Sequence, residues 1–303
     1  MRPAQHPVTE HQFTEPEFSE RHFSGRAFAK GHGTENDFVI LPDPEGRHDL
    51  TPAHAARLCD RRAGIGADGV LRVVRTRDTD QAGQARQAEW FMDYRNADGS
   101  IAEMCGNGIR VFARYLLEHG LAAGPSFAVA TRSGVRQVRA EPDGRITVDM
   151  GPARVLGPGR AVIGGAVRDG LRVSVGNPHL ACLVDDALDK FDLAAPPGLD
   201  PADFPGGGNV ELVRVTGPAA LSMRVHERGS GETRSCGTGA VAAAAAAASA
   251  TSSATRTVPG QWHVTVPGGA LTVTFDAGTS WLTGPAVIVA EGELDPDWLA
   301  ATS

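Results

Sequence analysis

The clearest periodic pattern in the chain is a single apolar face over residues 109–116, where apolar side chains recur at i, i+3, i+4 and i+7. This spacing predicts an amphipathic helix that buries one side. A run of alanines over 242–248 predicts a second helix, from 239 to about 250, because alanine has the highest helix propensity of all residues. Small side chains on every side of that second helix would allow close packing all round it.

Short strand patterns surround both predicted helices. Residues 209–213 and 222–226 alternate between apolar and polar side chains, which is typical of half-buried strands. The turn sequences Pro142-Asp143-Gly144 and Pro267-Gly268-Gly269 predict hairpins. Each half of the chain thus repeats one plan: strands, loops with asparagines, a Cys-Gly-x-Gly sequence that opens a helix, and further strands. We expect an α+β fold, the product of an internal duplication, in which a mostly antiparallel curved sheet wraps around one apolar helix in each half.

Length and charge limit the possible classes of protein. A chain of 303 residues is long enough for one large domain or two ordinary ones. Its formal net charge of −7 argues against nucleic acid as the main partner. No stretch reaches the roughly 20 apolar residues of a membrane span, and the polar residues 1–24 lack an apolar signal core. We expect a soluble cytoplasmic protein in which residues 1–24 form a disordered extension.

The cysteines and lysines narrow the possible chemistry. In a cytoplasmic protein, four cysteines are more typical of free thiols than of a disulfide framework. The only lysines are Lys30 and Lys190, so the chain offers few candidates for the buried Schiff-base lysine of a pyridoxal-phosphate enzyme.

Two of the cysteines come just before the predicted helices. Backbone N–H groups at a helix start are unpaired and the helix dipole is positive there, so a thiolate at Cys105 or Cys236 would be stabilised. This predicts that the pKa of each falls from about 8.5 towards 3.5–7.5. The alternatives are an inert buried thiol, our interpretation of Cys59 and Cys182, or a metal site. No Cys-x-x-Cys or His-x-x-x-His spacing supports a metal.

Further polar residues are candidates for binding a small molecule. Four asparagines are either ordinary turn formers or substrate ligands: Asn36, Asn96, Asn177 and Asn209. Glu227 and Arg228 precede a glycine-rich loop and suit an ammonium and an α-carboxylate, with surface ion pairing as the alternative. His179 is either a core histidine or a group that takes a proton from a cysteine.

Five sequence motifs together resemble the diaminopimelate epimerase family. They occur in the family's order, and the match covers the chain from about residue 27 to 295. The motifs are Lys30-Gly31-His32-Gly33 with Asn36-Asp37-Phe38, Asn96-Ala97-Asp98-Gly99, Met104-Cys105-Gly106-Asn107-Gly108, Gly176-Asn177-Pro178-His179, and Glu227-Arg228-Gly229-x-Gly231-Glu232-Thr233 with Cys236-Gly237-Thr238-Gly239. One departure is Gly69, which stands where some members carry a side-chain amide facing the site. Residues 1–24 also lie outside the family pattern.

The resemblance implies a fold of two pseudo-symmetric domains, with the active site in the cleft between them, and a homodimer. The N-terminal domain is expected over 25–149 and includes a return strand within 285–303. The C-terminal domain is expected over 150–284.

The resemblance also implies roles for individual residues. Cys105 and Cys236 are the two acid/base residues, and His179 and Glu227 help to set their protonation states. The substrate-binding residues are Asn36, Asn96, Gly106, Asn107, Asn177, Asn209, Glu227, Arg228, Gly237 and Thr238. Neither a metal nor an organic cofactor is implied.

The expected function is cofactor-independent epimerisation of LL-2,6-diaminopimelate to meso-diaminopimelate, in lysine and peptidoglycan precursor biosynthesis. One thiolate would remove the α-proton while the opposite thiol protonates the other face of the carbon. Two alternatives stay open: a proline- or hydroxyproline-type racemase of the same superfamily, and a thiol redox-switch binding protein. Asn107 and the Glu227-Arg228-Gly229 sequence favour the diaminopimelate type.

Overall fold

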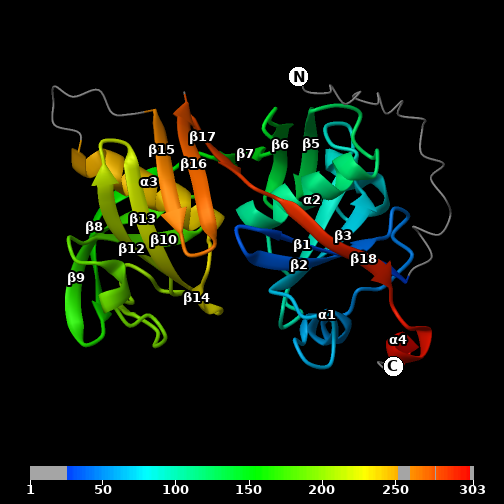
Figure 1. Cartoon of the computed structure of the whole chain (residues 1–303), viewed down its shortest axis with the longest axis horizontal. Helices are drawn as coiled ribbons and strands as arrows, with labels where there is room; N and C mark the ends of the chain where they lie inside the picture. The colour runs from blue at the N-terminus through cyan, green and yellow to red at the C-terminus, as the bar shows by residue number, and fades with distance from the viewer. Residues whose placement is uncertain (1–25, 252–259, 277, 301–303) are drawn as a thin grey trace, which may run out of the picture.

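The computed structural model describes residues 26–251, 260–276 and 278–300 (Figure 1). The extension predicted over 1–24 lies outside the described residues. The elements around helix α2 (Gly106–Glu118) are β1 (Ala27–Gly33), β2 (Asn36–Pro42), α1 (Pro52–Cys59), β3 (Gly69–Arg75), β4 (Trp90–Asn96), β5 (Ser126–Thr131), β6 (Gly134–Ala140), β7 (Ile146–Gly151), β18 (Val287–Glu293) and α4 (Pro296–Ala300).

The elements around helix α3 (Gly237–Thr251) belong mainly to the second half of the chain. They are β8 (Arg154–Ile163), β9 (Ala166–Ser174), β10 (Pro178–Leu183), β11 (Gly198–Leu199), β12 (Asn209–Gly217), β13 (Ala220–Glu227), β14 (Gly231–Thr233), β15 (Gln261–Val266), β16 (Gly269–Asp276) and β17 (Thr279–Gly284). Short 3₁₀ turns occur at η2 (Thr76–Asp78), η3 (Ala82–Gln84) and η4 (Leu188–Lys190).

One continuous ladder of paired strands runs through both halves. Its order is β18-β1-β2-β3-β4-β5-β6-β7-β17-β16-β15-β13-β12-β10-β9-β8-β11. Most neighbours are antiparallel, whereas β2–β3, β4–β5, β10–β12 and β13–β15 are parallel. The predicted α+β class, with a mostly antiparallel sheet around two apolar helices, is confirmed.

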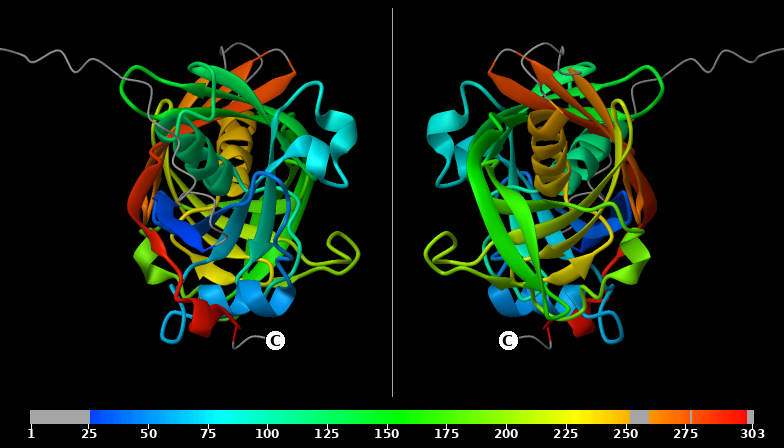
Figure 2. Two further views of the ribbon diagram at one scale, coloured as in Figure 1. Left: turned by 90° about the vertical axis from the view of Figure 1, so that its right-hand side faces the viewer. Right: turned by 90° about the vertical axis from the view of Figure 1, so that its left-hand side faces the viewer.

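Helix α2 is enclosed by the strands of its own half. The predicted apolar face over 109–116 is buried against β1, β2, β7 and β18. Figure 2 shows α2 and α3 inside the surrounding strands. Burial of that face supplies the hydrophobic driving force that an isolated helix of this length would lack.

Helix α3 is buried on all sides rather than on one face. Its alanines over 240–248 are buried, and strands from β8 to β17 contact the helix. Because a methyl group is the largest side chain along most of its length, strands can approach closely from every direction. The helix begins at Gly237, slightly before the predicted start, since Ala240 N–H already donates to the carbonyl of Cys236 (2.9 Å).

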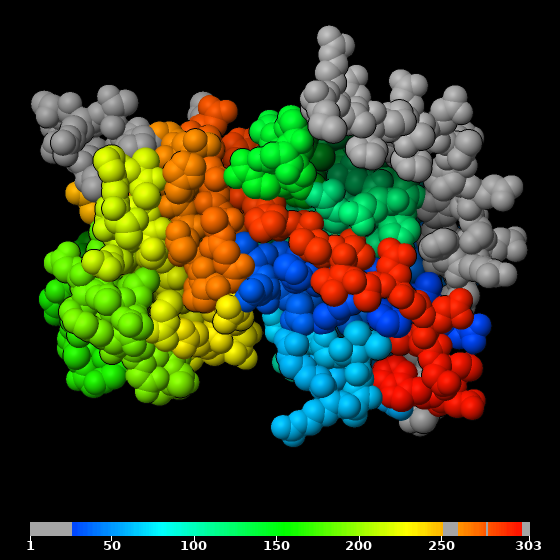
Figure 3. Space-filling view, viewed as in Figure 1, coloured from blue at the N-terminus to red at the C-terminus, as the bar shows by residue number. Residues whose placement is uncertain are grey.

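The last strand returns to the first half of the molecule. β18 pairs antiparallel with β1, from Ala27 opposite Glu293 to His32 opposite Val287. Figure 1 shows β18, in red, running from the α3 half back across the α2 half. The space-filling view in Figure 3 shows an indentation on this face between the two halves. Among the described residues, no helix combines the length and apolar content that crossing a bilayer needs.

Candidate active site

Each of the two cysteines predicted to act in catalysis caps a buried helix. Cys105 is the N-cap of α2, and its Sγ accepts a hydrogen bond from the Gly108 N–H (3.4 Å). Cys236 has the same relation to α3, with the Gly239 N–H 3.3 Å from its Sγ. A serine or aspartate oxygen usually fills this capping position, so here the sulfur takes the place of the capping oxygen.

The two helix starts touch one another. A Cβ placed on Gly237 would lie only 2.9 Å from the Cα of Gly106, so this contact requires glycine. The Asn107 Nδ2 donates to the carbonyl of Ser235 across the same junction (2.9 Å). The hydroxyls of Thr34 and Ser235 are 2.7 Å apart. The junction therefore brings the positive ends of two helix dipoles to one place, which favours binding of an anion there.

On the α2 side, Asn36 is fixed next to Cys105. The Asn36 Oδ1 lies 3.7 Å from the Cys105 Sγ and accepts from the Asn107 Nδ2 (3.1 Å). The Asn36 Nδ2 donates to the Asp68 carboxylate (2.7 Å). The amide of Asn107 is fully buried and bonded to protein groups through both its oxygen and its nitrogen. The side chain of Asn107 therefore holds the junction together, and the group of this residue left to bind a ligand is its backbone N–H.

On the α3 side, a chain of hydrogen bonds leads away from Cys236. Its Sγ is 3.5 Å from the Thr238 hydroxyl, which accepts from the Asn177 Nδ2 (3.4 Å). The Asn177 Oδ1 faces the Nε2 of His179 (2.9 Å), and the Nδ1 of His179 faces the Glu211 carboxylate (2.7 Å). The structure thus corrects the idea that His179 takes a proton directly from a cysteine, because both ring nitrogens are engaged elsewhere.

Glu227, Arg228 and Asn209 come together at the end of β13. The Glu227 carboxylate accepts a hydrogen bond from the Thr233 hydroxyl and is close enough to the Cys236 thiol to raise the pKa of that thiol. The Asn209 Oδ1 accepts from the backbone N–H of Arg228 (2.9 Å). The guanidinium of Arg228 bonds the Gly206 carbonyl (3.2 Å), so its other N–H groups are available to a ligand.

Asn96 is another of the predicted substrate-binding residues. It ends β4, and its Nδ2 donates to the Ser100 hydroxyl (3.0 Å). Its cross-strand partner is Gly69, where a Cβ would lie 2.6 Å from the Arg95 carbonyl oxygen. No side chain fits at Gly69 without a backbone shift, which explains why a side-chain amide is absent there.

The acidity predicted for the two thiols is wrong for this structure. Burial raises the pKa of Cys105 to about 11 and outweighs the N–H groups of Gly108 and Asn107, which lower it. Burial, followed by the carboxylates of Glu227 and Glu211, raises the pKa of Cys236 well above its ordinary value. The helix starts do stabilise a thiolate, but loss of water is the larger effect here.

Sequence reasoning missed two buried charged residues next to these thiols. Arg110 is fully buried in α2 and donates to the carbonyl of Gly106 (3.0 Å) and the hydroxyl of Thr34 (3.1 Å). Glu211 is fully buried in β12. The alternation over 209–213 puts Glu211 on the polar side of a half-buried strand, so that pattern gave no signal for its burial.

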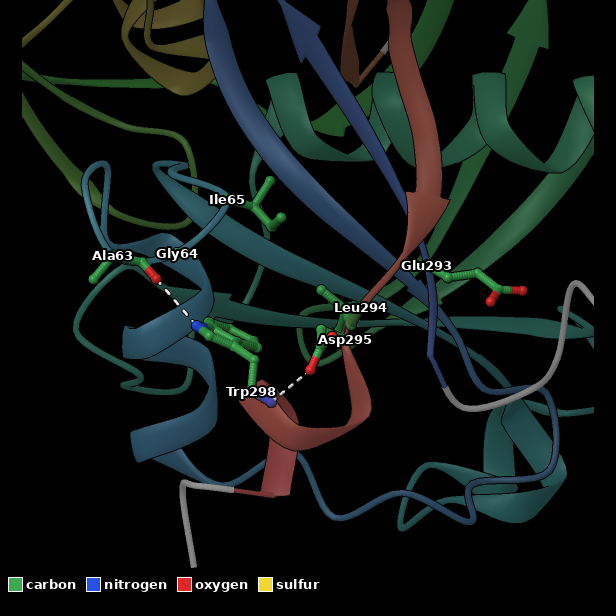
Figure 4. A pocket seen from close by; sticks show the side chains of 7 residues that line it. All are labelled: Ala63, Gly64, Ile65, Glu293, Leu294, Asp295 and Trp298. Carbon is green, nitrogen blue, oxygen red and sulfur yellow. Dashed lines mark hydrogen bonds between the residues drawn. The ribbon is translucent and has the colours of Figure 1, made fainter.

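A surface pocket elsewhere on the α2 half holds none of the predicted site residues. Figure 4 shows its lining, with the Trp298 indole donating to the Ala63 carbonyl (3.1 Å). The ring also stacks under the guanidinium of Arg57, 4.3 Å from its centroid. These contacts attach α4 to the fold, so we interpret the pocket as the edge of a packing contact.

The fold has counterparts among solved structures. A phenazine biosynthesis protein of the PhzF family from Bacillus anthracis superimposes with a TM-score of 0.65 at 16% identity, covering 89% of this chain and 98% of that one. A hydroxyproline epimerase from Agrobacterium vitis, with bound trans-4-hydroxy-L-proline, gives 0.62 at 14% identity, covering 90% and 94%. At these identities the two likenesses show a shared fold, in which this chain has two cysteine-capped helices that meet at one junction.

The family is shown by the sequence. The family model for diaminopimelate epimerase matches residues 28–156 and 171–292. The diaminopimelate epimerase of Thermobifida fusca is 60% identical over 275 residues, which is 88% of this chain and 97% of that protein. This chain belongs to the diaminopimelate epimerase family.

Proposed function

We propose that Cys105 and Cys236 act as the two proton-transfer groups on opposite faces of one stereocentre. Family membership makes the chain an isomerase that epimerises LL-2,6-diaminopimelate to meso-diaminopimelate without pyridoxal phosphate. We assign it to lysine and peptidoglycan precursor biosynthesis. The observation that carries the two-cysteine proposal is the contact between Gly106 and Gly237, because it places two thiol-capped helix starts at one junction.

The two helix starts stabilise the electron pair left on carbon, which is the role that an organic cofactor would otherwise have. The α-proton of an amino acid is a very weak acid, so the electron pair left on carbon must be stabilised. We propose that the α-carboxylate binds at the junction, where backbone N–H groups of both helices point towards it. The developing negative charge spreads into this carboxylate, next to fixed donors that need no reorganisation.

In each turnover, one cysteine takes a proton from the α-carbon and the other gives a proton to it. A thiolate on one face forms an S–H bond with the α-proton as the C–H bond breaks. The opposite thiol gives its proton to the carbon from the other face and becomes a thiolate. The carbon is inverted, and the two cysteines have exchanged protonation states, so the reverse reaction uses the same groups in opposite roles.

The high pKa of both thiols in the free protein fits ionisation that depends on the substrate. The substrate's α-ammonium brings a positive charge that stabilises a nearby thiolate, an effect absent from the empty site. The buried Glu227 carboxylate raises the pKa of the Cys236 thiol, and burial raises the pKa of Glu227 itself. We propose that Glu227 holds Cys236 as the neutral thiol until the substrate is bound.

We propose that the asparagines, the glycine-rich helix starts and Arg228 bind the substrate. Asn36 lies beside Cys105, and Asn177 and Thr238 lie in the hydrogen-bond chain from Cys236, so all three are close to the proposed proton-transfer groups. Arg228 is proposed to bind a substrate carboxylate through its remaining N–H groups. Asn96 is proposed to bind the substrate as well, although its Nδ2 already donates to the Ser100 hydroxyl.

We also propose the larger-scale features implied by the family. The division into 25–149 with the return strand of 285–303, and 150–284, is supported by the grouping of strands around α2 and α3, although its boundary falls inside β7. A homodimer is supported by the exposed side chains of Val287 and Val289 on β18. Cytoplasmic location is supported by free thiols at all four cysteines.

The test of the proposed activity is a stereoinversion assay on a panel of amino acids. Purified, reduced protein without added pyridoxal phosphate should convert LL-2,6-diaminopimelate to a mixture with the meso isomer, measured by chiral chromatography. Proline and trans-4-hydroxyproline should be left unchanged, since the junction is expected to be shaped for an open-chain diamino acid. Inversion of proline in preference to diaminopimelate would contradict the assignment.

A further inference from the structure

Glu211 is a buried carboxylate that has no role in the proton transfers proposed above. It lies in β12 between Val210 and Leu212, and its side chain is 0% exposed. Its Oε1 is 2.7 Å from the His179 Nδ1, while its Oε2 has no hydrogen-bond partner among the described residues. A buried carboxylate with one unpaired oxygen costs stability, so its presence needs another explanation.

The bonds around His179 determine where its protons lie. The Asn177 Oδ1 is a carbonyl oxygen and can only accept, so the Nε2 of His179 carries a proton and donates it. The contact between the His179 Nδ1 and Glu211 contains one further proton. Glu211 therefore fixes the tautomer and the plane of the ring, and the ring in turn fixes the Asn177 amide.

The fixed amide of Asn177 points its Nδ2 towards the start of α3. That nitrogen is 3.4 Å from the Thr238 hydroxyl, and Thr238 contacts the Cys236 sulfur at 3.5 Å. The Glu211 Oε1 also lies close behind the same helix turn, 2.8 Å from where a Cβ on Gly239 would be. Glu211 is thus linked to Cys236 by a chain of hydrogen bonds through His179, Asn177 and Thr238. Its Oε1 also lies beside the first turn of α3.

We propose that Glu211 is a positioning residue of the epimerase reaction, which acts through His179 to hold Asn177 and Thr238 in the orientation that the substrate and Cys236 require. The proposal rests on the two-cysteine function proposed above. The proton held between Glu211 and the His179 Nδ1 makes this pair neutral overall, so the proposed role of Glu211 rests on its hydrogen bonds.

Two substitutions separate the hydrogen bond from the charge. Glu211→Leu keeps the approximate volume but leaves the His179 Nδ1 without a partner. We expect kcat to fall by about tenfold or more, the loss of one hydrogen bond to a charged group, with a higher KM because Asn177 is released. Glu211→Gln can still bond Nδ1, so kcat should recover to within a few-fold of the wild type. In Glu211→Gln, the pH midpoint for alkylation of Cys236 by iodoacetamide should stay close to that of the wild type, since the Glu211–His179 pair and its glutamine replacement are both neutral overall.

A double-mutant cycle distinguishes positioning from a purely structural effect. In an Asn177→Ala background, adding Glu211→Leu should cause little further loss of kcat, because Glu211 acts through Asn177. Multiplication of the two losses would overturn the proposal. Glu118→Gln, which removes an exposed carboxylate paired with Arg114 on α2, is the matched control and should leave kcat, KM and the midpoint unchanged.

The other outcomes of these experiments test the positioning role of Glu211 separately from the two-cysteine function. If Glu211→Leu does not fold, Glu211→Gln still tests the proposal, and a tenfold loss of kcat in that variant would contradict it. Wild-type kinetics in both Glu211 variants would do the same. If Cys236→Ser retains normal turnover, the two-cysteine function itself has failed. If Cys236→Ser is inactive while Glu211→Leu is normal, only the positioning role has failed.

Discussion

Replacing either Cys105 or Cys236 by serine is expected to lower kcat by about 10³-fold or more, within the range for loss of a positioned proton-transfer group. A hydroxyl has nearly the size of a thiol and can still cap the helix, so each variant should fold. Its proton is far less acidic, however, and an alkoxide cannot form at neutral pH to remove the α-proton. Steady-state assays of the LL-to-meso conversion, run in both directions, measure the effect.

The control for this prediction is a cysteine outside the junction. Cys59 is the last residue of α1 and lies in a separate apolar cluster, and burial raises its pKa to about 11. Cys59→Ala should keep kcat within a few-fold of the wild type. Near-normal turnover in Cys105→Ser or in Cys236→Ser would remove that residue from the mechanism.

Replacing Arg110 by methionine is expected to lower the free energy of unfolding by about 3–5 kcal/mol. The guanidinium is fully buried and donates to four uncharged oxygens, those of Gly106, Thr34, Asn107 and Pro285. Methionine fills similar space but leaves these acceptors without donors. Removing a desolvated charge offsets part of the loss, since burial lowers the pKa of Arg110 to about 10. Urea denaturation measures the change.

Arg114 is the matched control, one helix turn further along α2. Its side chain is partly exposed, and it donates to the Ala286 carbonyl (3.2 Å). Arg114→Met should cost about 1 kcal/mol or less, because water can replace the lost donor. An Arg110→Met variant as stable as Arg114→Met would show that the buried guanidinium does not hold the junction together.

The sequence predicts the fold well where a pattern reports burial directly. The apolar face over 109–116 and the alanine run over 242–248 each identified a helix, and the strand alternation identified the sheets around them. The motifs identified both cysteines at the helix starts, because Cys-Gly-x-Gly followed by apolar residues is a local signal. Each of these predictions depends only on a short stretch of consecutive residues.

The properties that the sequence did not predict depend on contacts between residues that are far apart in the chain. The acidity of Cys105 and Cys236 was predicted from the helix start alone, whereas their pKa values follow from how completely the fold excludes water. His179 was assigned a direct role because its partner Glu211, which lies 32 positions away, had not been recognised. Glycine at position 69 is required by the backbone of Arg95, a residue of the neighbouring strand.

The most direct test of two thiols acting on opposite faces of one carbon is the isotope content of substrate and product at low conversion in D₂O. Thiol protons exchange with solvent before each turnover, so the group that protonates the carbon carries deuterium. We predict that newly formed meso-diaminopimelate carries one deuterium at the inverted carbon, while recovered LL-diaminopimelate carries none. Product that retains the substrate's own hydrogen at that carbon would mean that a single group removes and returns the proton, which contradicts the two-cysteine account.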